Sequence, residues 1–183
     1  MLGLPRGGVP VAAEIARVLH LPLDVIVVRK LGVPGRAELA MGAVGEGGVT
    51  VLNHRVLSAA GVLPEELARV AERERAAVER RVRELRGGRP AAPIAGRIAV
   101  VVDDGIATGA TARAACQVAR AREAGYVVLA APVAPPDVAL SASDAADEVV
   151  VLQTPASFSA VGEWYVDFTP TTDDEVIRLL HEA

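Results

Sequence analysis

The stretch Ala99-Val-Val-Val-Asp103-Asp104-Gly105-Ile106-Ala107-Thr108-Gly109-Ala110-Thr111 decides how this sequence is interpreted. Its apolar start has the composition of a strand that is buried on both faces. Two aspartates follow, and then a loop of small and hydroxyl residues opens a helix expected from about Ala110 to Glu123. A helix N-terminus favours phosphate, whereas paired carboxylates favour a diol or Mg²⁺. The stretch therefore predicts a site for a ribose 5-phosphate; an Asx turn would explain only one of the aspartates.

Strands and helices alternate on both sides of this stretch. Strands are expected at about Met1–Leu4, Asp24–Val28, Ile98–Val102, Tyr126–Ala131 and Glu148–Leu152. Helices are expected at about Val9–Leu19 (with Val11, Ile15, Val18 and Leu19 on the apolar stripe), Pro64–Arg86, Ala110–Glu123, Pro136–Ala145 and from Thr172 onward. Residues 31–52 are rich in glycine and are expected to form a flexible loop or ribbon. The pattern predicts one α/β domain over residues 1–183, with a mostly parallel sheet flanked by helices.

Composition and charge exclude several classes of protein. Apolar residues make up 51% of the 183, which is too many for a disordered chain. The net charge of −4 argues against nucleic-acid binding through bulk positive charge. One cysteine, Cys116, excludes an internal disulfide framework, and it is expected in the core. No apolar run reaches the ~20 residues of a membrane span and no signal peptide is evident, so a cytoplasmic protein is expected.

Two further segments carry residues that suit phosphate. Leu4-Pro5-Arg6-Gly7-Gly8 joins the first strand to the first helix, and its glycine amides and arginine fork could hold a diphosphate; a plain tight turn is the alternative. Lys30 is the only lysine among nineteen basic residues, which indicates a need for a compact ammonium group there. Glu38 and Glu46 are either proton-transfer groups or solvated side chains. The charged face of Pro64–Arg86 is interpreted as solvated, because its acidic and basic residues nearly cancel.

The residues Val100–Thr111 resemble the phosphoribosyl-pyrophosphate (PRPP) motif of type I phosphoribosyltransferases, whose fold is Rossmann-like. The resemblance implies that Asp103 and Asp104 bind the ribose hydroxyls. It also implies that the 5-phosphate is held by the loop Gly105, Ala107, Thr108, Gly109, Ala110 and Thr111. Arg6, Gly7 and Gly8 resemble the family's pyrophosphate loop, and Arg29-Lys30-Leu31-Gly32 resembles the entry to its flexible loop. Asp103, Asp104 and Lys30 are therefore the expected catalytic residues.

Four of the five aromatic residues gather near the C-terminus. This segment, about residues 154–171, resembles the family's C-terminal hood, with Phe158, Val161, Trp164, Tyr165 and Asp167 as candidate base-binding residues; an aromatic mini-core under a loop is the alternative. Mg²⁺ is the implied cofactor, held by Asp103, Asp104 and Asp167 directly or through substrate or water.

Some residues depart from the family's pattern. Gly105 replaces a larger apolar residue and is expected to loosen packing. Ala107 and Ala134 stand where hypoxanthine-type enzymes have an aspartate and a lysine, which argues against a 6-oxopurine substrate. The resemblance also implies a helix before these motifs, which this sequence does not contain; either its start is truncated or its first strand is expected to be partly exposed.

The implied activity is transfer of ribose 5-phosphate from PRPP to a nucleobase-type nitrogen acceptor, with release of pyrophosphate. The expected partners are therefore PRPP and that acceptor, and a homodimer is common for the fold. Two alternatives stay open: a non-catalytic PRPP-sensing module of the same fold, and a sugar-phosphate hydrolase.

Overall fold

A computed structural model describes residues 1–141 and 144–182, and for residues 139–141 it describes the backbone alone. Its elements in chain order are β1 (Leu2–Gly3), α1 (Gly8–Leu19), β2 (Asp24–Val25), β3 (Val28–Val33), β4 (Arg36–Gly45), the 3₁₀ turn η1 (Glu46–Gly48), β5 (Thr50–Leu52), α2 (His54–Ala60), α3 (Pro64–Arg86), β6 (Ile98–Val102), α4 (Ala110–Ala121), β7 (Tyr126–Val133), α5 (Pro136–Ser141), β8 (Glu148–Gln153), the 3₁₀ turn η3 (Val161–Trp164) and α6 (Asp173–Glu182).

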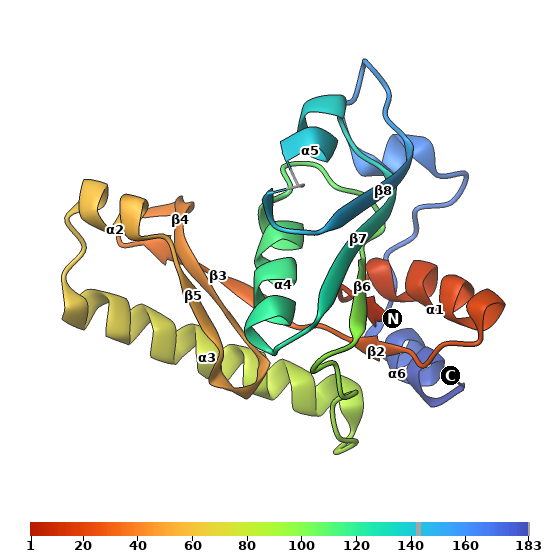
Figure 1. The fold of residues 1–183 in the computed structure, drawn as a ribbon, viewed down its shortest axis with the longest axis horizontal. Coiled ribbons are helices and arrows are strands. Elements are labelled where there is room, and N and C mark those ends of the chain that lie inside the picture. Colours follow the sequence, from red (N-terminus) through yellow and green to blue (C-terminus); the bar gives the residue numbers. More distant parts are fainter. Residues whose placement is uncertain (142–143, 183) are drawn as a thin grey trace.

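The main sheet is parallel throughout, in the order β2-β1-β6-β7-β8 (Figure 1). This order confirms the predicted α/β class. From β1 the chain moves outward to β2, and from β6 it moves outward in the opposite direction to β7. The strand order therefore reverses between β1 and β6, and in open α/β sheets the crevice at such a reversal is where ligands bind.

The two faces of the sheet pack against different helices. Ala99 and Val101 of β6 contribute to an apolar core that includes the buried face of α4. Val102, which points the other way, packs in a second core with Val9 of α1 and Val176 of α6. Figure 1 shows α1 and α6 together on one side of the sheet and α4 on the other. The ends of β1 and β6 are thus fixed from both faces.

The buried stripe of α1 differs from the expected one. Of the predicted residues, Val11 and Ile15 are partly buried against the core, whereas Val18 and Leu19 are mainly exposed. The fully buried positions are instead Gly8, Val9, Ala12 and Ala16. Small residues occupy the buried face because the helix lies very close to β1. A Cβ on Gly3 would come within 2.8 Å of the Val9 α-carbon. Larger side chains on this face would push the helix away from the strand.

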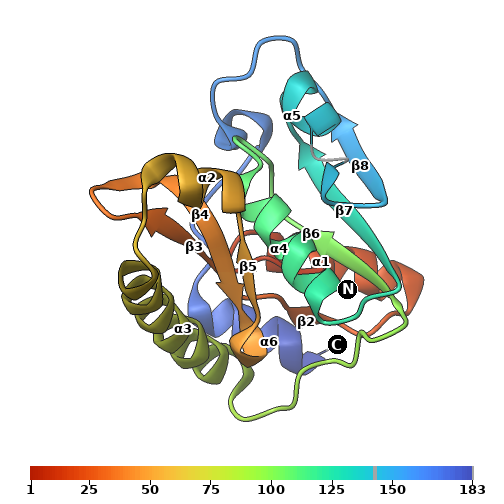
Figure 2. The same ribbon diagram turned by 60° about the vertical axis from the view of Figure 1, so that its left-hand side comes forward.

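A second sheet forms from the glycine-rich segment. β3, β4 and β5 pair antiparallel, so residues 31–52 belong to a folded ribbon rather than to an irregular loop. The expected strand Asp24–Val28 is divided, because β2 ends at Val25 and β3 begins at Val28 in the other sheet. α4 contacts strands of both sheets and lies between them (Figure 2). α2 follows the ribbon and was not predicted.

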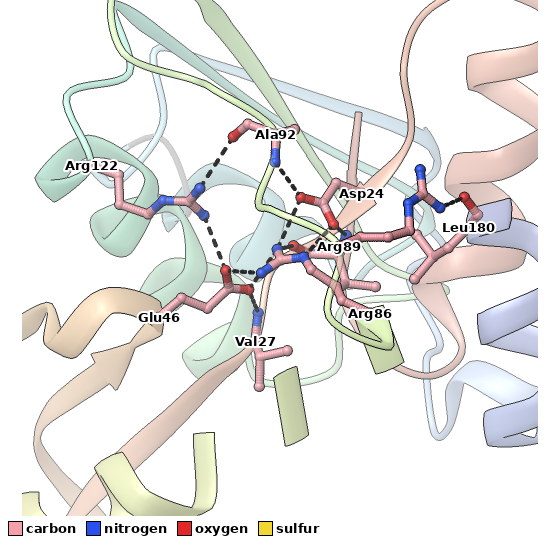
Figure 3. A network of polar contacts seen from close by, with 9 residues as sticks. Asp24, Val27, Glu46, Arg86, Arg89, Ala92, Arg122 and Leu180 are labelled. Atoms are coloured by element: carbon pink, nitrogen blue, oxygen red, sulfur yellow. Dashed lines mark hydrogen bonds and ion pairs between the residues drawn. The ribbon is translucent and has the colours of Figure 1, made fainter. Parts of the chain in front are cut away.

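A buried ion cluster fastens the ribbon to the parallel sheet (Figure 3). Arg86, at the end of α3, donates to the carboxylate of Asp24 at 2.7 and 2.9 Å and to that of Glu46 at 2.6 and 3.1 Å. All three side chains are buried, and Glu46 also accepts from the backbone N–H of Val27. Both interpretations of Glu46, as a proton-transfer group or as a solvated side chain, are therefore wrong. Its carboxylate is structural; Glu38 is exposed.

Most of the remaining elements agree with the sequence. α3 and β6 have the expected bounds, and α6 begins after Thr172, whose hydroxyl accepts from the N–H of Glu175 as its capping pattern predicts. Cys116 is buried, as expected, and burial raises the pKa of its thiol to about 12. Residues 142–143, which fall in the predicted helix Pro136–Ala145, lie outside the described residues. No helix in the described part of the chain is long and apolar enough to cross a membrane.

Candidate functional site

The acidic pair lies at the carboxyl edge of the parallel sheet, directly after β6. The backbone N–H of Asp103 donates to the carbonyl oxygen of Ala130 on β7, at 3.1 Å. The N–H of Asp104 donates to Oδ1 of Asp103 at 3.0 Å, and both side chains are half-buried. The two carboxylates are therefore placed where the last ladder hydrogen bonds end, beside the strand reversal between β1 and β6.

Burial opposes ionisation of this pair. Loss of hydration, together with the charge of Asp104, raises the pKa of Asp103 to about 7. Loss of hydration likewise raises the pKa of Asp104. A ligand that supplies hydroxyl donors or positive charge would stabilise the ionised carboxylates. Shifts of this kind are common at binding and catalytic sites.

The Arg6-Gly7-Gly8 loop packs directly on the acidic pair. A Cβ on Gly7 would lie 1.8 Å from Oδ2 of Asp104, and a Cβ on Gly8 would lie 2.4 Å from the carbonyl oxygen of Val102. Only glycine allows the backbone after β1 to approach the end of β6 so closely. The structure thus brings together two motifs that are far apart in the sequence. The Pro5–Arg6 peptide bond is cis.

The small-residue loop leads from the acidic pair into α4. Gly105 and Ile106 are buried, whereas Ala107 and Thr108 are exposed at the rim. Gly109 has a φ of +72°, which favours glycine, and α4 begins at the next residue. In the described chain no side chain caps this N-terminus, so its first amide groups are available to an anion.

The hood segment is attached to the acidic loop at two points. The hydroxyl of Tyr165 donates to the backbone carbonyl oxygen of Asp104 at 2.5 Å. Burial, with the nearby carboxylates, raises the pKa of Tyr165 to about 12. Val161 packs on Gly105, where an added Cβ would come within 2.4 Å of its Cγ1. The sequence predicts that Gly105 loosens the packing, and this prediction is wrong. The absence of a side chain at position 105 instead makes room for Val161 of the hood.

The remaining hood residues differ in whether they lie near the acidic pair. The rings of Tyr165 and Phe168 lie with centroids 5.1 Å apart and tilted by 42°. Phe158 is half-buried and Trp164 is exposed, and neither contributes to the cavity described next. The carboxylate of Asp167 accepts from the N–H and the hydroxyl of Thr169, which lowers its pKa.

One cavity joins Asp104, the glycine loop and the hood. It has a volume of about 600 Å³ and is lined by Arg6, Gly7, Asp104, Tyr165, Asp167 and Phe168, among others. In the part of the chain that the structure describes, no group of three or more His, Cys, Asp or Glu residues is arranged to hold a metal. Asp103, Asp104 and Asp167 therefore do not form a protein-only metal site there.

A second cavity lies on the other side of the glycine loop. It has a volume of about 390 Å³ and contains Leu4 and Pro5 after β1, Thr111 from the start of α4, and three arginines, Arg29, Arg80 and Arg81. Both glycine-rich motifs thus reach this cavity. Arg80 and Arg81 come from the face of α3 that the sequence indicated to be merely solvated.

Lys30 does not line either of these cavities. It lies in a third one, of about 430 Å³, with Ala110, Arg113 and Arg55. Successive residues of a strand point to opposite faces, so β3 directs Arg29 toward Thr111 and Lys30 away from it. The expected catalytic role of Lys30 stays a prediction, because Lys30 shares its cavity with Ala110 of the small-residue loop, while Arg29 shares one with Thr111.

An ion-pair triad connects the first two cavities. Arg81 donates to both carboxylate oxygens of Asp173 at 2.6 Å each, and Arg6 Nη1 lies 3.7 Å from Oδ1 of the same side chain. These pairs lower the pKa of Asp173, chiefly through the Arg81 hydrogen bonds, and raise that of Arg81. Sequence patterns gave no signal for this contact, because α3 and α6 meet only in the tertiary structure.

The fold and the site together define an α/β domain of the type I phosphoribosyltransferase fold. The family model described as the phosphoribosyl transferase domain matches residues 1–167, and the chain belongs to this family.

Proteins similar to this chain include one compared by sequence and one compared by its crystal structure. A protein of Mycobacterium tuberculosis, found in strains H37Rv and CDC 1551 and provisionally named a phosphoribosyl transferase, is 55% identical over all 183 residues. The chain spans 41% of the length of that relative. The crystal structure of TT1426 from Thermus thermophilus superposes with a TM-score of 0.91 at 46% identity, covering 99% of this chain and 86% of that one.

Proposed function

We propose that this domain binds PRPP with Mg²⁺ and transfers ribose 5-phosphate to a nitrogen atom of a nucleobase-type acceptor. In the reaction the bond between ribose C1 and the diphosphate oxygen breaks and a C1–N bond forms. Pyrophosphate leaves, and the proton of the acceptor nitrogen passes to solvent or to a base. The observation that supports the proposal is the close approach of Gly7 to the Asp104 carboxylate, because the loop proposed for the diphosphate then lies next to the acid pair proposed for the ribose hydroxyls.

The protein's contribution is to position PRPP and to compensate its charge. Asp103 and Asp104 accept hydrogen bonds from the ribose 2′- and 3′-hydroxyls, which favours their ionised form. The amides from Ala107 to Thr111 hold the 5-phosphate at the N-terminus of α4. The Arg6 guanidinium and the Gly7 amide stabilise charge on the departing pyrophosphate, whereas the Gly8 N–H already donates to the Leu4 carbonyl oxygen. Arg29 faces the same cavity as Thr111 and adds positive charge beside the diphosphate.

The oxygen donors at the site suit Mg²⁺ when PRPP supplies most of its ligands. Carboxylates are hard donors, and Mg²⁺ commonly binds one or two of them together with substrate phosphates and water. Asp103 and Asp104 would hold it in this way, whereas the Asp167 carboxylate already accepts two hydrogen bonds from Thr169. When bound, the ion supplies charge neutralisation to the leaving diphosphate.

The acceptor is proposed to bind under the hood. Tyr165 and Phe168 line the 600 Å³ cavity beside Asp104, and a flat nucleobase gains by stacking against aromatic rings. Ala107 and Ala134 offer no charged group to a 6-oxo substituent, so other bases are the better candidates.

Calorimetric titration with PRPP and Mg²⁺ tests the binding step. Asp104→Asn and Thr108→Ala should each weaken PRPP affinity by about 10-fold or more while the melting temperature stays close to that of the wild type. Asp174→Asn, at an exposed position on α6, is the control. Unchanged affinity in both site variants would refute the proposal.

Pyrophosphate release, assayed across a panel of nucleobases, tests the transfer step. Release that depends on one base supports the transferase. PRPP binding without release for any base would indicate the sensing module instead. Phosphate release from simple sugar phosphates would indicate the hydrolase.

A further inference from the structure

A carboxylate of the protein itself lies beside Arg6 of the proposed pyrophosphate loop and links it to Arg81 of α3. One carboxylate, that of Asp173, is held by Arg81 at 2.6 Å and lies 3.7 Å from Arg6. Arg6 lines the cavity with Asp104, and Arg81 lines the cavity with Pro5 and Thr111. Asp173 therefore shows that an anionic oxygen can lie within reach of both guanidinium groups at the junction of the two cavities.

We infer that Arg81 is part of the diphosphate site, and that Asp173 occupies this site until the diphosphate displaces it. The inference rests on the proposed function and deepens it, because it adds a residue of α3 to the binding site and an internal competitor from α6. A diphosphate carries several oxygens that can take bidentate hydrogen bonds from both arginines, whereas Asp173 offers a single carboxylate.

The surroundings of Arg81 favour an anion larger than one carboxylate. Arg29 and Arg80 line the same cavity, and Glu84 is the one acidic residue among its described lining residues. Glu84 lies 3.4 Å from Arg81, and Glu74 lies 3.7 Å from Arg29. The side chain of Arg80 makes no hydrogen bond or ion pair within the ranges that the structure describes. Once Asp173 has left Arg81, the three arginines therefore outnumber Glu74 and Glu84, and the excess positive charge lowers the cost of binding a polyanion.

The triad is exposed enough to exchange partners. The side chains of Arg6, Arg81 and Asp173 are 48%, 27% and 43% exposed. Ion pairs with this exposure are weak, since water competes for both charges. Release of Asp173 is therefore within the free energy that diphosphate binding supplies, and the apparent affinity for diphosphate is reduced by the fraction of molecules in which Asp173 is bound.

Calorimetric titration with pyrophosphate and with PRPP, each in the presence of Mg²⁺, tests the inference. Asp173→Asn should tighten both affinities by about 2- to 6-fold, because the competitor is lost. Arg81→Ala should weaken both by about 10-fold. Asp174→Asn, at the neighbouring exposed position, should leave both unchanged. Thermal melting checks that each variant is folded.

The double variant Arg81→Ala/Asp173→Asn separates direct contact from an indirect effect. If Arg81 touches the diphosphate, its removal weakens affinity in the Asp173→Asn background as well. If Arg81 acts only by holding Asp173, its removal has no effect there, and the inference is overturned. Weaker or unchanged binding in Asp173→Asn would overturn it too. Neither result contradicts the proposed function as long as Asp104→Asn still weakens PRPP binding. If the wild type does not bind PRPP, both the proposed function and this inference are wrong.

Discussion

At the scale of single residues, Asp104 and Gly7 determine each other's position. The carboxylate of Asp104 occupies the space that a side chain at position 7 would need. The neighbouring Gly8 instead faces a backbone carbonyl, that of Val102. A rotatable carboxylate can move away from an added methyl group, whereas a strand backbone cannot, so the same substitution has different consequences at the two positions.

Alanine at positions 7 and 8 should separate binding from stability. Gly7→Ala should weaken PRPP affinity by about 10-fold through the displaced carboxylate, with a change in unfolding free energy below about 1 kcal/mol, since Gly7 already has helical φ and ψ. Gly8→Ala should lower the unfolding free energy by about 1–3 kcal/mol. Calorimetry and urea denaturation measure the two effects; equal loss of stability in both variants would contradict this explanation.

The raised pKa of Asp103 predicts a dependence of stability on pH. Between about pH 4, near the ordinary pKa of an aspartate, and about pH 7, the folded protein holds a proton that the unfolded chain has lost. Stability from this group is therefore greatest at the acidic end of the interval and falls as pH rises to 7. Asparagine cannot ionise and avoids this cost.

Urea denaturation of Asp103→Asn at pH 4.5 and pH 8 measures the effect. Relative to the wild type, the variant should gain roughly 2 kcal/mol more stability at pH 8 than at pH 4.5. Asp174→Asn, at an exposed position, provides the matched comparison. A difference that does not change with pH would show that Asp103 ionises freely in the folded protein.

At the scale of elements, the orientation of β3 determines which of two basic side chains lines the cavity of Thr111. Arg29 and Lys30 are adjacent, but they line different cavities. Arg29→Ala should therefore weaken PRPP affinity by about 10-fold and Lys30→Ala by less than about 3-fold. Calorimetry with PRPP and Mg²⁺ on the two variants tests this order. The reverse order would mean that PRPP extends into the cavity of Lys30.

At the scale of the whole molecule, the Arg86 cluster connects β2, the end of the ribbon, α3 and the connection to β6. Asp24 Oδ2 also accepts from the N–H of Ala92 in that connection, and Arg122 of the α4 C-cap lies 3.7 Å from Glu46. The cluster thus sets the distance between the two sheets, and with it the position of β3 beside the site.

Loss of Arg86 should destabilise the entire fold. Arg86→Ala leaves two buried carboxylates without their partner and should lower the unfolding free energy by about 3–5 kcal/mol. Arg83→Ala, at an exposed position on the same helix, should change it by less than about 0.5 kcal/mol. Urea denaturation compares the two. A small decrease in the unfolding free energy of Arg86→Ala would show that water or another cation replaces the guanidinium.

Local patterns in the sequence are sufficient for most elements of the parallel sheet and its helices and for the two loops, but not for α2 or for the division between β2 and β3. Strand β6, helix α3 and the capping of α6 follow from apolar runs, helical spacing and a Thr–Glu pair, all of which act within a few residues. The stripe of α1 is right for Val11 and Ile15 and wrong for Val18 and Leu19, because the spacing shows where apolar residues lie, but not how close the neighbouring strand comes. The ribbon was harder to predict, because glycine permits both loops and twisted strands.

By itself, the sequence determined the α/β class, the acid pair after a buried strand and the glycine loops beside it, since each depends on neighbours along the chain. Only the tertiary structure decided that Gly7 meets Asp104, that Arg29 rather than Lys30 faces Thr111, and that Asp173 lies between Arg6 and Arg81. Those contacts join residues far apart in the chain, and their geometry depends on strand order, side-chain direction and the packing of α3 against α6.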